Sequence, residues 1–227
     1  MVEDPIEHDQ PPMRARYHHG DLRAALLQAG RDLIEREAAL TLRGAAQLAG
    51  VSAAAPYRHF ADRDALFAGV LAQGFDELAE RTGQARLAAA DPVQAYLGVG
   101  AAYLQVAAEH PSLYRRMFGP DCDKPGYPDL LAAEQRAFGV VLAAATDCEA
   151  AGLLARPALE VAIAGWTMVH GLASLHTDGT LAVVHPQHEL MATAQAIFGI
   201  LVEGVLPRTA DTDGRAPGKS KGPPKRA

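Results

Sequence analysis

The sequence predicts an all-α protein of about nine helices, and three observations lead to this fold class. Of its 227 residues, 49% are apolar but only 6% are aromatic. Alanine, which has the highest intrinsic helix propensity, is abundant, whereas residues that favour strands are scarce. Apolar residues also recur at steps of three and four, which is the period of an amphipathic helix. Together these features disfavour a β-barrel or a β-sandwich.

Start and stop signals divide the chain into helices and terminal segments. Residues 1–16 contain three prolines and no helical period, so we expect a disordered arm. Residues 17–62 are expected to form a small helical module and residues 63–206 a larger helical domain. Residues 207–227 predict a disordered basic tail. In chain order, the expected helices are 21–38, 42–49, 53–60, 63–81, 93–109, 111–119, 128–151, 157–175 and 186–205.

Polar caps and a glycine set the ends of the first helices. Thr41 can cap the helix over 42–49, and Gly50 can end it in the left-handed conformation. Ser52 is expected to cap the helix over 53–60, with Pro56 in its first turn, where a missing N–H costs little. Asp62 is expected to cap the helix that follows.

Prolines mark the later helices. Asp91 followed by Pro92 is a cap and first-turn pair for the helix over 93–109, and Pro157 and Pro186 are expected to begin the last two helices. The segment 119–128 holds three prolines and two glycines, which predicts a loop.

Charge is distributed unevenly along the chain. The formal net charge is −6, which taken alone argues against a polyanionic partner. Residues 13–64, however, carry eight arginines against six acidic residues, whereas residues 65–207 are strongly acidic. This asymmetry is expected when only one end of a protein meets nucleic acid, although an excess of two charges can also be incidental.

Cysteine content and targeting signals indicate the compartment. The two cysteines, Cys122 and Cys148, are too few for a disulfide framework and lack the paired spacing of a zinc site. The N-terminus is acidic, unlike a secretory signal. The longest apolar stretch, 161–175, is shorter than the roughly 20 residues of a membrane span. We therefore expect a cytoplasmic protein that does not enter a membrane.

Residues 40–70 carry the most informative pattern. The segment LAGVS, 48–52, joins two short helices with the length and central glycine of a helix-turn-helix. The pattern resembles the N-terminal signature of the TetR family of bacterial transcriptional regulators, and the preceding YHHGDLRAALLQAG resembles the opening of many members. The likeness covers residues 17–70. The matching residues are Thr41, Arg43, Ala46, Ala49, Gly50, Val51, Ser52, Tyr57, His59, Phe60 and Leu66, with Arg63 where the family usually has lysine.

The resemblance implies double-stranded DNA as a partner. Tyr57 and His59 could donate hydrogen bonds to phosphates, Arg63 could bind a phosphate at a helix N-terminus, and Arg43 could reach a base edge. The alanines at 53–55 offer only methyl contacts to thymine, so specificity would also depend on DNA shape. The predicted DNA-binding residues are Thr41, Arg43, Ser52, Ala53, Ala54, Tyr57, Arg58, His59 and Arg63.

From about residue 85 onward the resemblance to the TetR family weakens. Residues 166–171 nevertheless resemble the W-x-x-x-H-G motif of a TetR C-terminal subgroup. That resemblance implies a homodimer through 157–205 and hence a palindromic operator. The expected interface residues are Trp166, Gly171, Ile197, Phe198, Leu201 and Val202.

The family folds these helices around a central cavity, which implies a small apolar or amphipathic effector, although the burial habits of such side chains favour ordinary core packing for any one of them. The expected function is a repressor that its effector releases from DNA. The candidate pocket residues are Tyr96, Tyr103, Met117, Phe138, Trp166 and His170, with Tyr114 and Met168 nearby in the pattern.

Other functions remain open at this point. No catalytic motif is present, so we expect no enzyme activity, and no cofactor is indicated. A metal-responsive regulator could use His185, His188, Cys148 or Asp147. Transcriptional activation is an alternative to repression, and the basic tail could bind DNA non-specifically.

Overall fold

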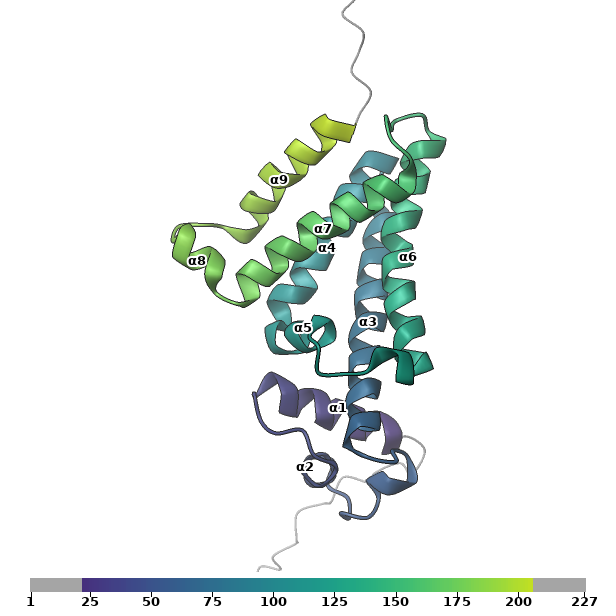
Figure 1. Ribbon diagram of the computed structural model, residues 1–227, viewed down its shortest axis with the longest axis vertical. Coiled ribbons are helices and arrows are strands. Elements are labelled where there is room, and N and C mark those ends of the chain that lie inside the picture. Colours follow the sequence, from purple (N-terminus) through teal and green to yellow (C-terminus); the bar gives the residue numbers. More distant parts are fainter. Residues whose placement is uncertain (1–21, 206–227) are drawn as a thin grey trace, which may run out of the picture.

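A computed structural model describes residues 22–205, with side chains up to residue 202. This part of the chain is entirely helical, which confirms the predicted fold class (Figure 1). The predicted arm and basic tail lie outside the described residues. The elements are α1 Leu22–Glu35, α2 Leu42–Leu48, η1 Pro56–Arg58, α3 Arg63–Ala88, α4 Pro92–Glu109, α5 Pro111–Phe118, η2 Lys124–Gly126, α6 Pro128–Ala150, α7 Ala158–Thr177, α8 Thr180–Val184 and α9 Leu190–Val205.

The N-terminal elements form a small unit at one end of the molecule (Figure 1). α1, α2 and η1 pack around the first turns of α3 through buried side chains such as Leu26, Leu42, Phe60 and Leu66. Gly30 allows the close approach of α1 to α3, because a Cβ there would lie 2.8 Å from the Val70 side chain. The apolar side chains inside this unit therefore belong to one core that continues into the rest of the chain.

α3 connects this unit to the larger helical bundle. It has 26 residues, so it is about 39 Å long at the usual rise per residue. The predicted end near Arg81 is too early, because the helix continues to Ala88. Buried Thr82 donates from its hydroxyl to the Leu78 carbonyl, and Arg86 forms an ion pair with Asp147 of α6 at 2.7 Å. These contacts hold the additional turns against the bundle.

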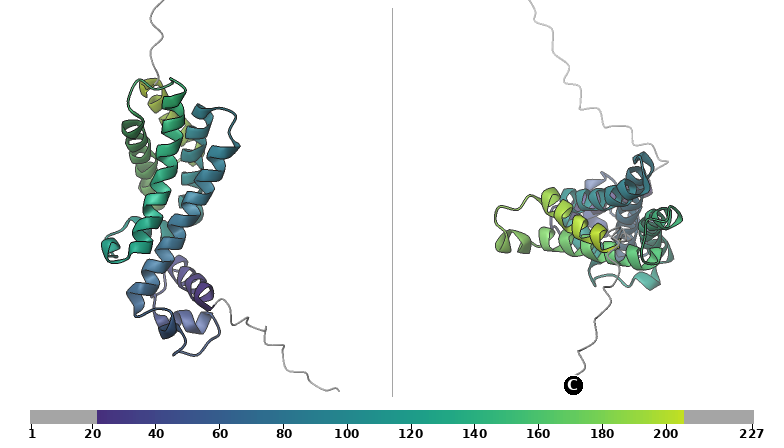
Figure 2. Two further views of the ribbon diagram at one scale, coloured as in Figure 1. Left: turned by 90° about the vertical axis from the view of Figure 1, so that its right-hand side faces the viewer. Right: turned by 90° about the horizontal axis from the view of Figure 1, so that it is seen from above.

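The larger bundle is built from α3, α4, α6 and α7, with α9 against α4 and α7 (Figures 1 and 2). Small residues set its closest contacts. A Cβ on Gly165 of α7 would lie 1.9 Å from the Tyr96 hydroxyl, and a Cβ on Gly100 of α4 would lie 2.6 Å from the Phe198 ring. The aromatic rings of α4 and α9 therefore rest on glycine backbone.

The predicted third helix, 53–60, does not form as an α-helix. The structure has turns followed by the short 3₁₀ segment η1, closed by bonds such as Ala55 N–H to Ser52 O and His59 N–H to Pro56 O. With Ser52 as the cap, Pro56 would be the first residue whose N–H bonds back to the cap carbonyl, and proline has no N–H. The expectation that Pro56 would be harmless was wrong for this reason.

The predicted last helix, 186–205, is also divided differently. A short helix, α8, precedes it, and α9 begins only at Leu190. Pro186 lies in a turn closed by the His188 N–H on the His185 carbonyl at 3.0 Å, where it occupies the second position that proline favours. Gly179, with φ of +75°, makes the preceding left-handed turn between α7 and α8.

α7 is long and apolar enough to cross a membrane by length and composition, but one third (33%) of its most apolar window is buried within the chain. It packs against α4, α6, α8 and α9. Core helices of soluble proteins have the same properties, so one such helix is weak support for a membrane span.

Candidate nucleic-acid interface and effector cavity

The predicted DNA-binding residues gather at the free end of the N-terminal unit, on α2, η1 and the start of α3 (Figure 1). All nine are exposed, and Tyr57 keeps 64% of its surface accessible. Their supports face inward: Leu42, Ala45 and Ala46 of α2 are buried, while Arg43 on the same helix points outward. The apolar period of α2 thus separates a core face from a face available to a partner.

Local hydrogen bonds position this surface as the sequence predicted. Thr41 caps α2, since its hydroxyl accepts a hydrogen bond of 2.9 Å from the Gly44 N–H. Gly50 ends the helix region with φ of +68°. Asp62 caps α3 by accepting from the Ala65 N–H at 2.8 Å. These three positions fix the entry and exit of the segment that would meet DNA.

Four polar side chains on this surface are available to an external partner. Arg43, Tyr57, Arg58 and His59 make no hydrogen bond or ion pair with any other residue that the structure describes. Guanidinium, phenol and imidazole groups can all donate to phosphate oxygens. The arrangement can therefore bind a nucleic-acid backbone without breaking internal contacts.

Arg63 is held differently from the other candidates. Its guanidinium lies 2.7 Å from the Asp64 carboxylate and donates to the Leu40 carbonyl at 3.4 Å. The same guanidinium lies over the Phe67 ring. A phosphate bound by Arg63 would compete with Asp64, but this ion pair is solvent-exposed and contributes little net free energy.

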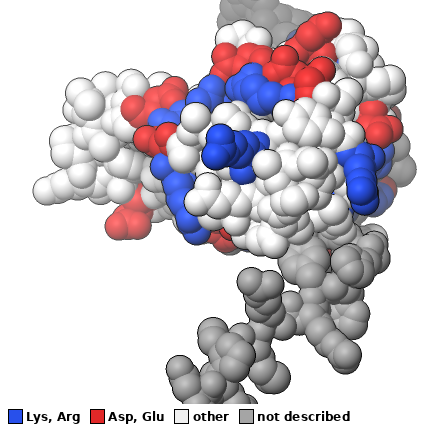
Figure 3. All heavy atoms as spheres, turned by 90° about the horizontal axis from the view of Figure 1, so that it is seen from below, with Lys and Arg blue, Asp and Glu red and all other residues white. Residues whose placement is uncertain are grey.

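The end of the molecule that carries these residues is only weakly basic. Figure 3 shows separate basic groups divided by uncharged surface, with acidic groups around the top, left and right of the view. Arg31, for example, is paired with Glu77 at 2.6 Å. Binding at this surface would depend on the specific contacts named above more than on a strong overall field.

Most predicted pocket residues meet in the centre of the larger bundle. Tyr96, Tyr103 and Trp166 line a narrow space with Phe198, and Tyr103, Phe138 and Trp166 line a second one beside it. Their volumes are about 20 and 30 Å³, close to the space of single water molecules. A drug-sized ligand needs roughly 300 Å³ or more, so the structure shows the cavity closed.

Two of the predicted pocket residues, Met117 and His170, line neither central space, and Met117 is the more deeply buried of the two. Met117 is 1% exposed and packs against α3, where a Cβ on Gly74 would lie 2.7 Å from its sulfur. Helical periodicity placed it correctly in the core but could not show which side of the core it faces.

A polar network lies next to the closed cavity. The Tyr114 hydroxyl is 2.7 Å from Nδ1 of His170, and the Tyr103 hydroxyl lies 3.2 Å from the same nitrogen. Desolvation lowers the pKa of His170, with a smaller effect from the Lys124 charge, and desolvation raises the pKa of both tyrosines. Phe118, which the sequence analysis missed, covers the network with its ring 4.6 Å from the His170 ring.

Tyr96 is anchored separately in the same core. Its hydroxyl donates to the Val161 carbonyl at 2.7 Å, and burial raises the pKa of Tyr96 to about 12. The phenol is therefore neutral, and it ties α4 to α7 beside the cavity.

Three of the expected interface residues, Trp166, Phe198 and Leu201, line the first central space. Phe198 and Leu201 are buried where α9 packs against α4 and α7 of the same chain, and Trp166 of α7 is half-buried. Their part in a dimer interface stays a prediction. The outward apolar residues of the two helices are Leu159, Ile163, Leu175 and Ile200.

The candidate metal ligands do not form a centre. The Cys148 thiol is buried and donates to the Pro92 carbonyl, and Asp147 pairs with Arg86. Nδ1 of His188 donates a hydrogen bond to the His185 carbonyl at 2.8 Å. Between residues 22 and 202 no group of three or more histidine, cysteine, aspartate or glutamate side chains could hold a metal ion.

Comparisons with known proteins agree with this architecture. Residues 96–198 match the model of the tetracyclin repressor-like C-terminal domain. A protein of unknown function from Rhodococcus sp. RHA1 is 27% identical, with a TM-score of 0.75 over 85% of this chain and 100% of that chain. The search of curated proteins found no matching relative.

Two more distant structures share the fold. A TetR-family transcription regulator from Marinobacter aquaeolei is 16% identical, with a TM-score of 0.60 over 82% of this chain and 96% of its own. The regulator FadR from Bacillus subtilis, in complex with stearoyl-CoA, is 12% identical, with a TM-score of 0.65 over 80% of this chain and 98% of its own. The matched C-terminal domain and the shared architecture show that the chain has the fold of TetR-family transcription regulators.

Proposed function

We propose that this chain is a homodimeric transcriptional regulator that binds DNA through residues 41–63 and responds to a small effector in the larger bundle. The observation that carries the proposal is the exposed set of Arg43, Tyr57, Arg58 and His59, which has no internal partners among the described residues. The inner face of α2, with Leu42 and Ala45, is packed into the core behind them. A surface that is rigidly supported and chemically unoccupied is suited to an external polyanion.

The proposed dimer accounts for the apolar surface of α7 and α9. Leu159 and Ile163 lie about one turn apart on the same face of α7 and are 52% and 47% exposed, and Ile200 of α9 is 68% exposed. Exposed apolar residues that share helix faces indicate a protein interface. A second copy would cover them, and its two-fold symmetry would place two DNA-binding ends on a palindromic operator.

The proposed effector is apolar or amphipathic. The lining of the central spaces is almost entirely apolar, and FadR of the same fold holds stearoyl-CoA. Since the cavity here is closed, the effector would have to displace side chains such as Phe198 or Trp166. A ligand that binds the opened state better than the DNA-bound state would release DNA, and repression is the mode we propose.

Fluorescence anisotropy with labelled DNA from upstream of this protein's own gene tests the DNA-binding part. We expect the double variant Arg43→Ala, Tyr57→Phe to bind at least about tenfold more weakly than the wild type. Arg136→Ala is the matched control, because Arg136 is an exposed arginine on α6 paired with Asp76. Its affinity should match the wild type.

The salt dependence and a second DNA complete this experiment. Specific binding should exceed binding to random DNA of equal length and weaken steeply with salt, because phosphate contacts release counterions. Equal affinity of the double variant and the wild type for the upstream DNA would contradict the proposed surface. If DNA binding is specific, a reporter gene placed downstream of the same DNA separates repression from activation. Repression lowers its expression when the protein is present, and activation raises it.

A further inference from the structure

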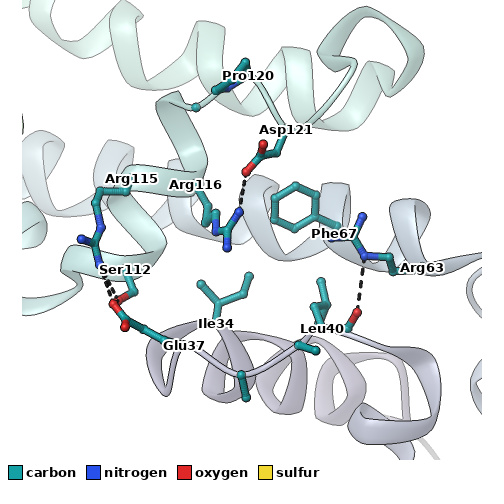
Figure 4. Close-up of a pocket in the computed structure, with 13 residues that line it drawn as sticks. Ile34, Glu37, Leu40, Arg63, Phe67, Ser112, Arg115, Arg116, Pro120 and Asp121 are labelled. Atoms are coloured by element: carbon teal, nitrogen blue, oxygen red, sulfur yellow. Dashed lines mark hydrogen bonds and ion pairs between the residues drawn. The ribbon is translucent and has the colours of Figure 1, made fainter.

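A second and much larger hollow lies outside the central cavity, between the N-terminal unit and α5. We call it the α5 groove. It has a volume of about 560 Å³, within the range of small-molecule sites. Its walls come from the end of α1, the segment 37–40, the first turns of α3, and α5 with the residues after it (Figure 4).

Part of the lining of the α5 groove is apolar. Ile34, Leu40 and Phe67, which are 6%, 7% and 2% exposed, contribute to its base, and Ala39 and Pro120 also line it. In Figure 4 the Phe67 ring and the Ile34 and Leu40 side chains face a common space below α5. These side chains give an apolar body a contact at the base of a groove that is otherwise partly polar.

Three arginines stand around the same floor. Arg63 comes from α3, and Arg115 and Arg116 come from α5. In Figure 4 the guanidinium of Arg116 lies between Ile34 and Phe67, near the middle of the groove. Guanidinium groups bind carboxylates in a planar, bidentate geometry, which favours an anionic head group.

The present partners of these arginines are exchangeable. Arg116 pairs with Asp121, only five residues away, and Arg115 pairs with Glu37 at 2.8 Å. The side chains of Arg116 and Asp121 are 53% and 46% exposed. Solvent-exposed ion pairs contribute little net free energy, so a ligand carboxylate can replace Asp121 on Arg116 at small cost.

From these observations we propose that the α5 groove binds a small carboxylate with an apolar body, its head group on Arg116 and its body on Ile34, Leu40 and Phe67. The site is separate from the central cavity, because none of the side chains that line the two central spaces also lines this groove. A ligand there touches both the N-terminal unit and the larger bundle. An effect of this ligand on DNA binding rests on the proposed function, whereas binding of the ligand to the α5 groove does not.

Octanoate binding to the full chain, measured by calorimetry without DNA, tests the site independently of the proposed function. We expect saturable binding, at least tenfold weaker for 1-octanol, which has the same chain without the charge. Arg116→Gln should weaken octanoate binding at least tenfold, whereas Arg136→Gln on α6 should change it less than twofold. Ala39→Phe should also weaken binding, because it fills the groove without altering any charge.

The single tryptophan of the sequence locates the bound ligand. Trp166 lines the central spaces, so octanoate in the α5 groove should leave its fluorescence unchanged. Thermal melts followed by circular dichroism show whether each variant is folded. If Arg116→Gln does not fold, octanoate binding to Ala39→Phe still tests the groove. Three results would overturn the proposal. The first is no octanoate binding to the wild type, and the second is equal binding to the wild type and both groove variants. The third is binding that changes Trp166 fluorescence and is insensitive to these variants.

Discussion

The contact between Gly165 of α7 and Tyr96 of α4 predicts that a single added methyl group destabilises the bundle. In Gly165→Ala the new Cβ would lie 1.9 Å from the Tyr96 hydroxyl oxygen and 2.9 Å from the ring carbon that bears it. The ring must move, and its 2.7 Å hydrogen bond to the Val161 carbonyl must lengthen or break. The substitution therefore combines overpacking with a lost buried hydrogen bond.

The magnitude follows from three opposing effects. Overpacking costs about 1–3 kcal/mol, and the lost hydrogen bond costs about 1 kcal/mol. Alanine regains about 1 kcal/mol through its higher helix propensity. The expected net loss in the free energy of unfolding is about 1–3 kcal/mol, which lowers the melting temperature by roughly 2–12 °C for a chain of this size.

Urea and thermal unfolding followed by circular dichroism measure this loss, at one fixed protein concentration because association would shift the transition. Gly139→Ala is the matched control: Gly139 lies in α6, and a Cβ there would meet nothing within 4 Å. It should stabilise the protein slightly through helix propensity. Tyr96→Phe should cost less in the Gly165→Ala background than alone, since it removes the clashing oxygen. If Gly165→Ala were as stable as Gly139→Ala, the assigned close contact would be refuted.

Two further predictions concern a helix cap and the buried histidine. Thr41→Ala removes the hydroxyl that accepts from the Gly44 N–H, and it should cost about 1 kcal/mol in urea unfolding, while Thr41→Ser should retain most of that stability. Burial lowers the pKa of His170 in the folded chain, so below its ordinary pKa of about 6.5 the unfolded chain binds a proton that the folded chain does not. Stability should therefore fall between pH 7 and pH 5.5, and this fall should be smaller in His170→Gln; an identical pH dependence in both proteins would contradict the burial argument. Part of the fall should remain in the variant, because desolvation also lowers the pKa of His176.

Local signals in the sequence determined several helix starts and the left-handed turn at Gly50. Thr41, Asp62 and Asp91 were predicted as caps, and each accepts a backbone hydrogen bond from the residue three positions ahead. Gly50 was predicted in the left-handed conformation and adopts it. These interactions span only a few residues, so their geometry depends little on the rest of the fold.

Local signals failed where two of them competed. Around Pro56 the cap residue Ser52 favoured a helix, but the missing proline N–H removed its first hydrogen bond and left a 3₁₀ turn. At Pro186 a turn formed where a helix start was expected. In both cases the residue type was informative, and the exact position of the proline relative to the hydrogen-bond pattern decided the outcome.

The sequence by itself determined which residues are apolar, where most helices begin, and which polar residues lie on the surface near α2. The tertiary structure alone decided which partner each apolar face meets. Phe198 and Leu201 pack inside the protomer and Ile200 is left outside, although all three lie on one apolar helix. Closure of the central cavity and opening of the α5 groove were decided in the same way. A helical period records that a face is apolar, but the surface that buries it comes from residues far away in the sequence, whose positions only the packed chain defines.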